Sequence, residues 1–151
     1  VCAAVIFFKD NSTASGDDVY IYVVGAISVG GGEKLALDVL IQNNRENIER
    51  VIQCIRKLYP HLQEEITVED FYSNIVIKIL DEPELDITLS AWSLTYEEAK
   101  KDICKIILED VEIPYLGLES LIKSKETERE QDIWDVKILK ELAKKNKQDT
   151  K

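Results

Sequence analysis

The last third of the chain combines two helical patterns with a strongly polar junction between them. Leu118, Leu121 and Ile122 recur at the i, i+3 and i+4 spacing that places apolar side chains on one face of a helix. A second stripe of helical periodicity follows and comprises Ile133, Val136, Leu139, Leu142 and Ala143. The sequence therefore predicts a C-terminal pair of helices that meet at a charged corner.

The corner between these two helices is dense in charge. Lys123 and Lys125 end the first helix, where cations suit the negative end of the helix dipole. Arg129 and Asp132 lie where the second helix begins. Taken alone, this pattern indicates a solvated loop with charged helix ends.

Upstream of the corner, apolar runs of strand length surround one long helical pattern. The strand-like runs occupy residues 1–8, 19–24, 35–41, 74–80 and 85–89, and the turn DEPE between the last two predicts a hairpin. Asn43 and Glu46 have the spacing of a capping box, and helical intervals follow until Pro60. We expect one α+β domain over residues 1–143 and a flexible basic tail over residues 144–151.

Charge and cysteine usage argue against several classes of function. The net charge of -10 is unsuited to a protein that binds nucleic acid mainly through its phosphates. Cys2, Cys54 and Cys104 are widely spaced and His61 is the only histidine, which disfavours zinc sites and histidine-dependent nucleophilic catalysis.

The odd cysteine count predicts a cytoplasmic protein. The apolar opening VCAAVIFF is too short to span a membrane, so no membrane partner is expected.

Two aspartates interrupt apolar strands. Asp38 lies within the run 35–41, and Asp86 lies within the run 85–89. An ionised carboxylate in a buried strand is costly unless it is paired, hydrogen-bonded or bound to a metal. Strand ends that face water explain both residues structurally. Adjacent strands that direct both carboxylates into one cleft would instead hold Mg²⁺ against a nucleoside triphosphate.

Two further features are interpreted as structural. The segment GAISVGGGEK has glycines and a lysine but not the spacing of a phosphate-binding P-loop, so it predicts a turn. Trp92 and Trp134 have core-like neighbours, and we expect them to pack in the core rather than to stack on bases.

The C-terminal motif LESLIKSKETEREQDIWDVKIL resembles the signature of small nucleotidyltransferase-like proteins of the polymerase-β superfamily, in the group associated with antitoxins and abortive infection. That family's pattern continues from a Leu-Glu-Asp-Leu-Ile segment through a lysine and an arginine to Lys-Asp-Leu-x-Asp. The resemblance covers most of the chain from Val23 onward. Its Val-Gly turn, its Asp-x-Asp strand and its later aspartate are matched by Gly25, Asp38 and Asp86.

This resemblance implies a nucleotidyltransferase-like mixed β-sheet with flanking helices and a C-terminal helical pair. It implies that Asp38 and Asp86 are catalytic metal ligands for Mg²⁺. It also implies substrate-binding roles for Gly25, Lys125, Arg129 and Asp132. The chain departs from the family pattern at Ala26, Ala36 and Gln131, and Ala36 stands where the first aspartate of Asp-x-Asp is expected.

Two functions are consistent with this resemblance. The first is an enzyme that transfers a nucleotidyl group from a nucleoside triphosphate to a hydroxyl of a protein or an RNA. The second is a catalytically degenerate module that binds a nucleotide or a protein partner, for example in a toxin–antitoxin pair. Ala36 distinguishes them, because its side chain cannot bind a metal.

The segment after Trp92 has two competing predictions. By pattern, Thr95 and Glu98 form a second capping-box spacing, and the apolar residues that follow allow a helix as far as Leu108. The resemblance instead implies that this helix ends earlier and that two short strands around a Glu-Asp turn follow it. We adopt the prediction that the resemblance implies.

Overall fold

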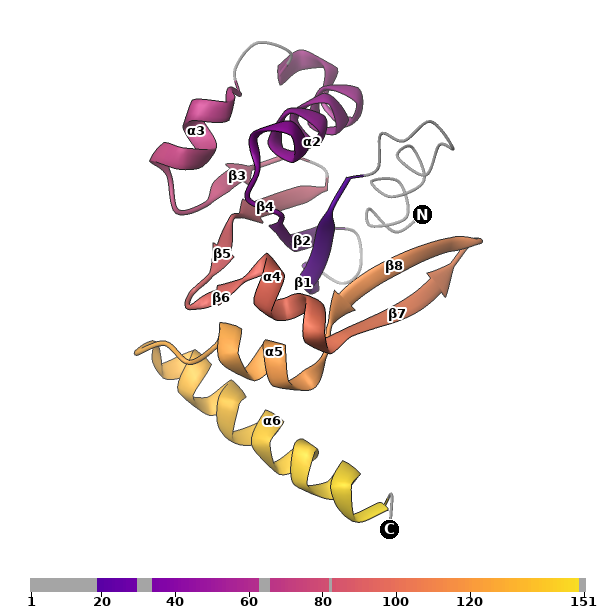
Figure 1. Cartoon of the computed structure of the whole chain (residues 1–151), viewed down its shortest axis with the longest axis vertical. Helices are drawn as coiled ribbons and strands as arrows, with labels where there is room; N and C mark the ends of the chain where they lie inside the picture. The colour runs from indigo at the N-terminus through magenta and orange to yellow at the C-terminus, as the bar shows by residue number, and fades with distance from the viewer. Residues whose placement is uncertain (1–18, 30–33, 63–65, 82, 150–151) are drawn as a thin grey trace.

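Six strands form one mixed sheet through the centre of the fold (Figure 1). The computed structural model describes residues 19–29, 34–62, 66–81 and 83–149. In the order β3-β4-β2-β1-β8-β7, the sheet consists of β1 (Ile21–Val29), β2 (Lys34–Ile41), β3 (Ile77–Ile79), β4 (Glu84–Thr88), β7 (Ile103–Leu108) and β8 (Val111–Leu116). Two short strands, β5 (Ser90–Ala91) and β6 (Leu94–Thr95), form a separate hairpin.

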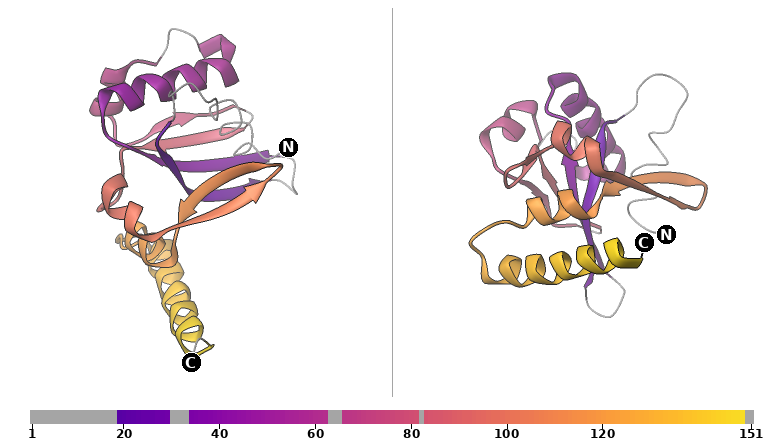
Figure 2. Two further views of the ribbon diagram at one scale, coloured as in Figure 1. Left: turned by 45° about the vertical axis from the view of Figure 1, so that its right-hand side comes forward. Right: turned by 60° about the horizontal axis from the view of Figure 1, so that its bottom comes forward.

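Helices lie on both sides of this sheet (Figure 2). One side carries α2 (Arg45–Leu58), the short 3₁₀ helix η1 (Pro60–Leu62) and α3 (Val68–Ser73). The other side carries α4 (Tyr96–Ala99), the 3₁₀ helix η2 (Lys100–Asp102), α5 (Leu118–Ser124) and α6 (Glu130–Asp149). The predicted α+β class, with a mixed sheet, flanking helices and C-terminal helices, is confirmed.

Strand β2 sends alternate side chains to the two faces of the sheet. Leu37 and Val39 are buried in the larger hydrophobic core, beneath α2 and α3. Leu40 points the other way and joins a smaller core with residues of β6, α4 and β8. Asp38 shares the face of Leu40, because residues two apart on a strand project to the same side. The predicted site residue therefore lies on the side of the C-terminal helices.

The helix predicted to end before Pro60 is confirmed, but its cap differs from the predicted capping box of Asn43 and Glu46. The Asn44 side chain accepts a hydrogen bond from the backbone N–H of Asn47 at 2.8 Å, and Asn44 has the extended backbone of an N-cap residue. Two consecutive asparagines offer the same capping chemistry. The backbone path out of β2 decides which of them is used.

The segment with two open structures forms a short helix followed by two strands. Thr95 and Glu98 make the predicted capping box, but α4 ends at Ala99. Strands β7 and β8 then pair antiparallel around Glu109 and Asp110, whose φ angles are 48° and 65°. Positive φ at both central residues is the geometry of a tight hairpin turn. The strand prediction is confirmed.

The other predicted strands differ in extent from the observed ones. β1 begins at Ile21 and continues to Val29, past the predicted end at Val24. The run 74–80 forms only the short strand β3, which pairs antiparallel with β4 in the predicted hairpin. The strand predicted over residues 1–8 lies outside the described residues.

Helix α6 is longer and more exposed than its sequence suggests. It continues through Asp149, so residues 144–149, which we assigned to the tail, are helical. Three members of its predicted apolar stripe are partly buried, whereas Ile133 and Leu142 are 44% and 46% exposed. Only part of the stripe faces the rest of the protein, and α6 extends away from the sheet (Figure 1).

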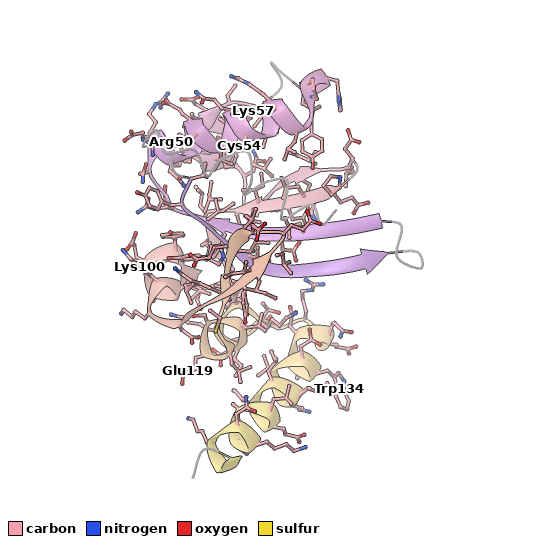
Figure 3. All side chains as sticks on the ribbon, turned by 90° about the vertical axis from the view of Figure 1, so that its right-hand side faces the viewer. Arg50, Cys54, Lys57, Lys100, Glu119 and Trp134 are labelled. Carbon is pink, nitrogen blue, oxygen red and sulfur yellow. The ribbon has the colours of Figure 1, made fainter. Side chains whose placement is uncertain are left out.

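Both tryptophans are exposed, so the prediction that they pack in the core is wrong. Trp92 is 61% exposed and lies in the turn between β5 and β6. Trp134 is 64% exposed, and its side chain points away from α6 (Figure 3). Their apolar neighbours in sequence are misleading, because a tight turn and a helix each direct adjacent side chains to different sides.

Candidate functional site

A row of four residues crosses four strands on one face of the sheet. Asp38 of β2 is in register with Asp86 of the parallel strand β4. Gly25 of β1 is opposite Asp38, and Lys78 of β3 is opposite Asp86. Residues in register on neighbouring strands project to the same face. The two aspartates therefore lie side by side, as a shared metal site requires.

Gly25 borders the Asp38 carboxylate. The pairing of β1 with β2 shifts between Val23 and Gly25, and this bulge alters the direction of the strand beside Asp38. A Cβ atom at Gly25 would lie 3.5 Å from Oδ2 of Asp38, which is ordinary contact. A side chain here would fit without strain, but it would cover the carboxylate.

A cleft of about 750 Å³ opens in front of this row. It is lined by Val24, Gly25, Asp38, Trp92, Ser124, Lys125, Thr127, Glu128, Arg129 and Asp132. These residues come from β1, β2, the β5–β6 turn and the α5–α6 corner. Five of the six predicted site residues thus meet in one cleft, and the sixth, Asp86, lies beside Asp38 in the next strand.

The α5–α6 corner is held together by carboxylates. Asp132 is 7% exposed and accepts a hydrogen bond from the hydroxyl of Thr127 at 2.5 Å. Its carboxylate also lies 3.8 Å from Lys125 Nζ and 3.8 Å from Arg129 Nε. Because Asp132 is buried among these partners, it positions the two cations at the edge of the cleft.

Asp135 also belongs to this corner, although sequence reasoning did not select it. Its carboxylate accepts hydrogen bonds from Lys125 Nζ at 2.7 Å and from the Gln131 amide at 3.0 Å. These hydrogen bonds lower the pKa of Asp135, and the hydrogen bond from Lys125 has the larger effect. The signal was present in the sequence, since Asp135 matches the last aspartate of the Lys-Asp-Leu-x-Asp pattern.

The Asp38 carboxylate is electrostatically unfavourable in its ionised form. Partial burial is the main cause that raises the pKa of Asp38, and repulsion by Asp86 raises this pKa further. The positive charges of Lys78 and Lys125 act in the opposite direction. Three carboxylates and two cations line the cleft, so its formal charge is not positive. Lys125 and Arg129 by themselves would make the cleft positive. The neighbouring acidic groups offset both cations.

The residues present fit a single Mg²⁺ ion. Two adjacent carboxylates are hard oxygen ligands, and Mg²⁺ in nucleotide sites is commonly held by one or two carboxylates together with phosphate oxygens and water. A divalent cation beside Asp38 would also relieve the repulsion from Asp86. Within the described residues, no group of three or more histidine, cysteine, aspartate or glutamate side chains is arranged to hold a metal.

Two features around these carboxylates reduce the metal-binding capacity of the site. The Lys78 ammonium donates a hydrogen bond to Asp86, so that carboxylate already has a cationic partner. Ala36 lies two residues before Asp38 on the same face, where a third carboxylate is expected by resemblance.

Lys78 was not selected from the sequence. Its alternation with apolar residues on β3 was the available signal, because it places Lys78 on the face opposite the core residue Ile79.

Among the helices of the described segments, none combines the length and the apolar character that crossing a membrane requires. Comparison with known proteins found no matching family model. No curated protein and no solved structure matches the chain either.

Proposed function

We propose that the cleft binds a nucleoside triphosphate with Mg²⁺, as the nucleotidyltransferase-like resemblance implies. The observation that supports this proposal is the meeting of Gly25 and Asp38 with Lys125 and Arg129 in one cleft. These residues are separated by about a hundred positions in the chain, and the fold joins them at an oxygen-rich row beside two cations. This combination suits an anionic, metal-binding ligand.

Each residue of the site has a physical role in this proposal. Asp38 and Asp86 would hold Mg²⁺, which neutralises phosphate charge and polarises the phosphoryl oxygens. Lys125 and Arg129 would donate hydrogen bonds to the phosphates. Gly25 leaves the Asp38 carboxylate uncovered on the β1 side. A hydroxyl of a protein or an RNA, entering the open cleft, would lose its proton and attack the α-phosphorus, and pyrophosphate would leave as the bond between the α-phosphorus and the bridging oxygen breaks.

A non-catalytic nucleotide-binding or interaction module is the second candidate, and two observations favour it. Ala36 removes one expected carboxylate, and Lys78 is already paired with Asp86. The Lys78 ammonium contacts the Asp86 carboxylate and would compete with a metal ion for the same oxygen. We therefore expect nucleotide binding with weak or absent transfer.

Calorimetric titration with Mg-ATP and Mg-GTP tests the binding proposal. Replacing Lys125 and Arg129 together by Gln should weaken binding about 10-fold or more, because each charge-assisted hydrogen bond contributes roughly 1.5–3 kcal/mol. The matched control replaces the exposed pair Lys100 and Lys101, which lie outside the cleft, by Gln. No measurable nucleotide binding by the parent chain, or equal losses in both double variants, would refute the proposal.

Transfer is tested with labelled nucleoside triphosphates, Mg²⁺ or Mn²⁺ and a cell lysate. Labelling of an acceptor that disappears in Asp38→Asn would establish an enzyme and overturn the module. If the parent binds nucleotide without labelling an acceptor, Ala36→Asp should strengthen the Mg²⁺ dependence of binding, because it restores a carboxylate on the same strand face. Unchanged Mg²⁺ dependence would show that position 36 does not contribute to the metal site.

A further inference from the structure

Trp92 is the only aromatic side chain among the residues that line the described cleft. It lies in the two-residue turn between β5 and β6, where Ala91 pairs with Leu94. Leu94 is buried in the smaller core, which anchors the turn, whereas Trp92 is 61% exposed. The turn thus presents a large apolar side chain to solvent at the cleft, next to a strand that is held in the core by Leu94.

The backbone of Trp92 supports a role in binding. Its φ angle is 56°, in the left-handed region that favours glycine. A bulky residue in this region is unusual, and such unfavourable conformations cluster at ligand sites. Glycine would suit the turn better, so the presence of an indole at the cleft points to a use for the indole itself.

From these observations we infer that Trp92 is the platform on which the base of a bound nucleoside triphosphate stacks. The inference rests on the proposed function, and it assigns the base and the phosphates to different elements. The indole comes from the β5–β6 turn, whereas Lys125 and Arg129 come from the α5–α6 corner. Stacking on an aromatic face tolerates any base, and larger purines gain more contact than pyrimidines.

The test compares two ligands that differ in whether they carry a base. Trp92→Gly removes the indole and suits the left-handed turn, so the variant should remain folded. We expect it to bind Mg-ATP about 5- to 150-fold more weakly, the range measured when stacking aromatics are removed. Binding of magnesium tripolyphosphate, which has no base, should be unchanged. Trp92→Phe should retain most of the affinity for Mg-ATP.

Trp134→Gln is the matched control, because Trp134 is as exposed as Trp92 but lies outside the cleft. In a Trp134→Phe background, Mg-ATP should also quench the fluorescence of Trp92, the remaining tryptophan. If the parent binds Mg-ATP and Trp92→Gly binds it equally well, stacking is refuted while the proposed function stands. If Trp92→Gly weakens the binding of magnesium tripolyphosphate as much as that of Mg-ATP, Trp92 only shapes the cleft and stacking is refuted. If the parent binds neither ligand, the proposed function itself fails.

An independent observation concerns the outer face of α6. Trp134, Ile138 and Leu142 recur at i, i+4 and i+8 and are 64%, 56% and 46% exposed. Their spacing makes an exposed apolar stripe on α6, and this helix extends away from the sheet (Figure 1). Lys137 Nζ lies 5.0 Å from the centre of the Trp134 ring, but it leaves most of the stripe uncovered. An exposed helical stripe of large side chains is typical of a contact surface.

Charge along α6 indicates which partner fits this stripe. The helix begins with acidic residues, and its second half is mainly basic, with Lys140, Lys144, Lys145 and Lys147 against Glu141 and Asp149. We propose that a second copy of the chain packs its α6 antiparallel on the stripe. Residues equally distant from Ile138 then face one another, so Trp134 meets Leu142 and Glu130 lies within a turn of Lys144. Opposite charges face one another only when the two α6 helices pack antiparallel, because parallel packing would place like charges side by side. Such self-complementarity is what a two-fold interface requires.

Sedimentation of the full chain over a range of concentrations tests this interface. A few large side chains make a small interface, so we expect a dimer that dissociates at about micromolar concentrations. Ile138→Glu, which places like charges face to face at the two-fold axis, should abolish the dimer. Ile133→Glu is the control on the same helix, because Ile133 is also exposed but does not belong to the exposed stripe of Trp134, Ile138 and Leu142. Glu130→Lys should weaken the dimer, and adding Lys144→Glu should restore it. A monomer at all concentrations, or equal effects of the two isoleucine variants, would overturn the proposal.

Discussion

At the scale of single residues, the site depends on one unfavourable carboxylate. Asp38 is partly buried and lies beside Asp86, and both conditions disfavour its charge. Lys78 and Lys125 offset this repulsion only in part, so the pKa of Asp38 remains raised. A group whose charge is disfavoured in the folded state lowers stability at neutral pH, and proteins retain such groups mainly where a ligand uses them.

The raised pKa of Asp38 predicts a pH-dependent effect of Asp38→Asn on stability. The folded protein binds this proton more tightly than the unfolded chain, so the stability contributed by protonated Asp38 is present below pH 3.8 and is lost as pH rises through the higher folded pKa. Asp38→Asn should therefore increase the free energy of unfolding at pH 7 without Mg²⁺. The gain should shrink as pH falls toward 3.8.

Urea unfolding of the parent and the variant over this pH range measures the effect. Glu119→Gln, an exposed carboxylate outside the cleft, is the control and should change the unfolding free energy little at either pH. A loss of stability in Asp38→Asn at pH 7 would mean that pairing with the nearby lysines outweighs burial.

At the scale of elements, the α5–α6 corner is placed by the junction of η2 with α5. Gly117 donates its backbone N–H to the carbonyl of Asp102 at 2.6 Å, and the Asp102 carboxylate accepts from the N–H of Ser120 at 2.7 Å. The Asp102 side chain thus accepts a hydrogen bond from one of the N–H groups that have no partner within the helix at the start of α5. This close approach sets where Lys125 enters the cleft.

Gly117→Ala should disrupt this junction. An added Cβ would lie well inside contact distance of both the carboxylate and the carbonyl of Asp102, so one of the two segments must move. We expect a loss of about 1–3 kcal/mol in the free energy of unfolding, as for overpacked sites. Gly25→Ala is the matched control, because its Cβ would meet only the Asp38 carboxylate at ordinary contact distance. Chemical denaturation of both variants checks this, and equal stability of the two would contradict it.

At the scale of the whole molecule, one buried side chain ties the layer of α2 to the sheet. Asn47 is 1% exposed, and its side chain accepts from the N–H of Tyr20 at 2.8 Å. Its amide donates to the carbonyls of Tyr20 and Gln42, each at 3.0 Å. It thereby joins the start of β1 and the end of β2 to the helix, and every strand of the site is positioned relative to this pair.

Asn47→Ala should lower the free energy of unfolding by about 2–4 kcal/mol, because three hydrogen bonds are lost. The Tyr20 N–H loses the partner that Asn47 provides, whereas the carbonyls of Tyr20 and Gln42 keep backbone N–H partners. Asn44→Ala removes the N-cap bond of the same helix and an exposed hydrogen bond to the Gln42 side chain, and it should cost about 1 kcal/mol. Thermal and urea unfolding of the two variants measure the difference. A cost no greater than that of Asn44→Ala would mean that water replaces the lost hydrogen bonds.

The sequence by itself determined the elements whose signals are local. Helical periodicity before Pro60 and the capping box of Thr95 and Glu98 each act within a few residues. Even there, the choice between two adjacent asparagines for the cap of α2 depended on the backbone path. Local patterns specify an element more reliably than they specify its first residue. The β7–β8 hairpin is different, because the local pattern allowed a helix as far as Leu108 and only the resemblance predicted the two strands.

Only the tertiary structure decided how the site is assembled. Strand register places Asp86 beside Asp38 and gives Asp86 the partner Lys78, and no local pattern determines which strands pair. The exposure of Trp92 depends on a turn anchored by the burial of Leu94. These outcomes are decided by contacts between segments distant in sequence, where the energetic cost of a buried carboxylate or an exposed indole depends on what the fold places next to it.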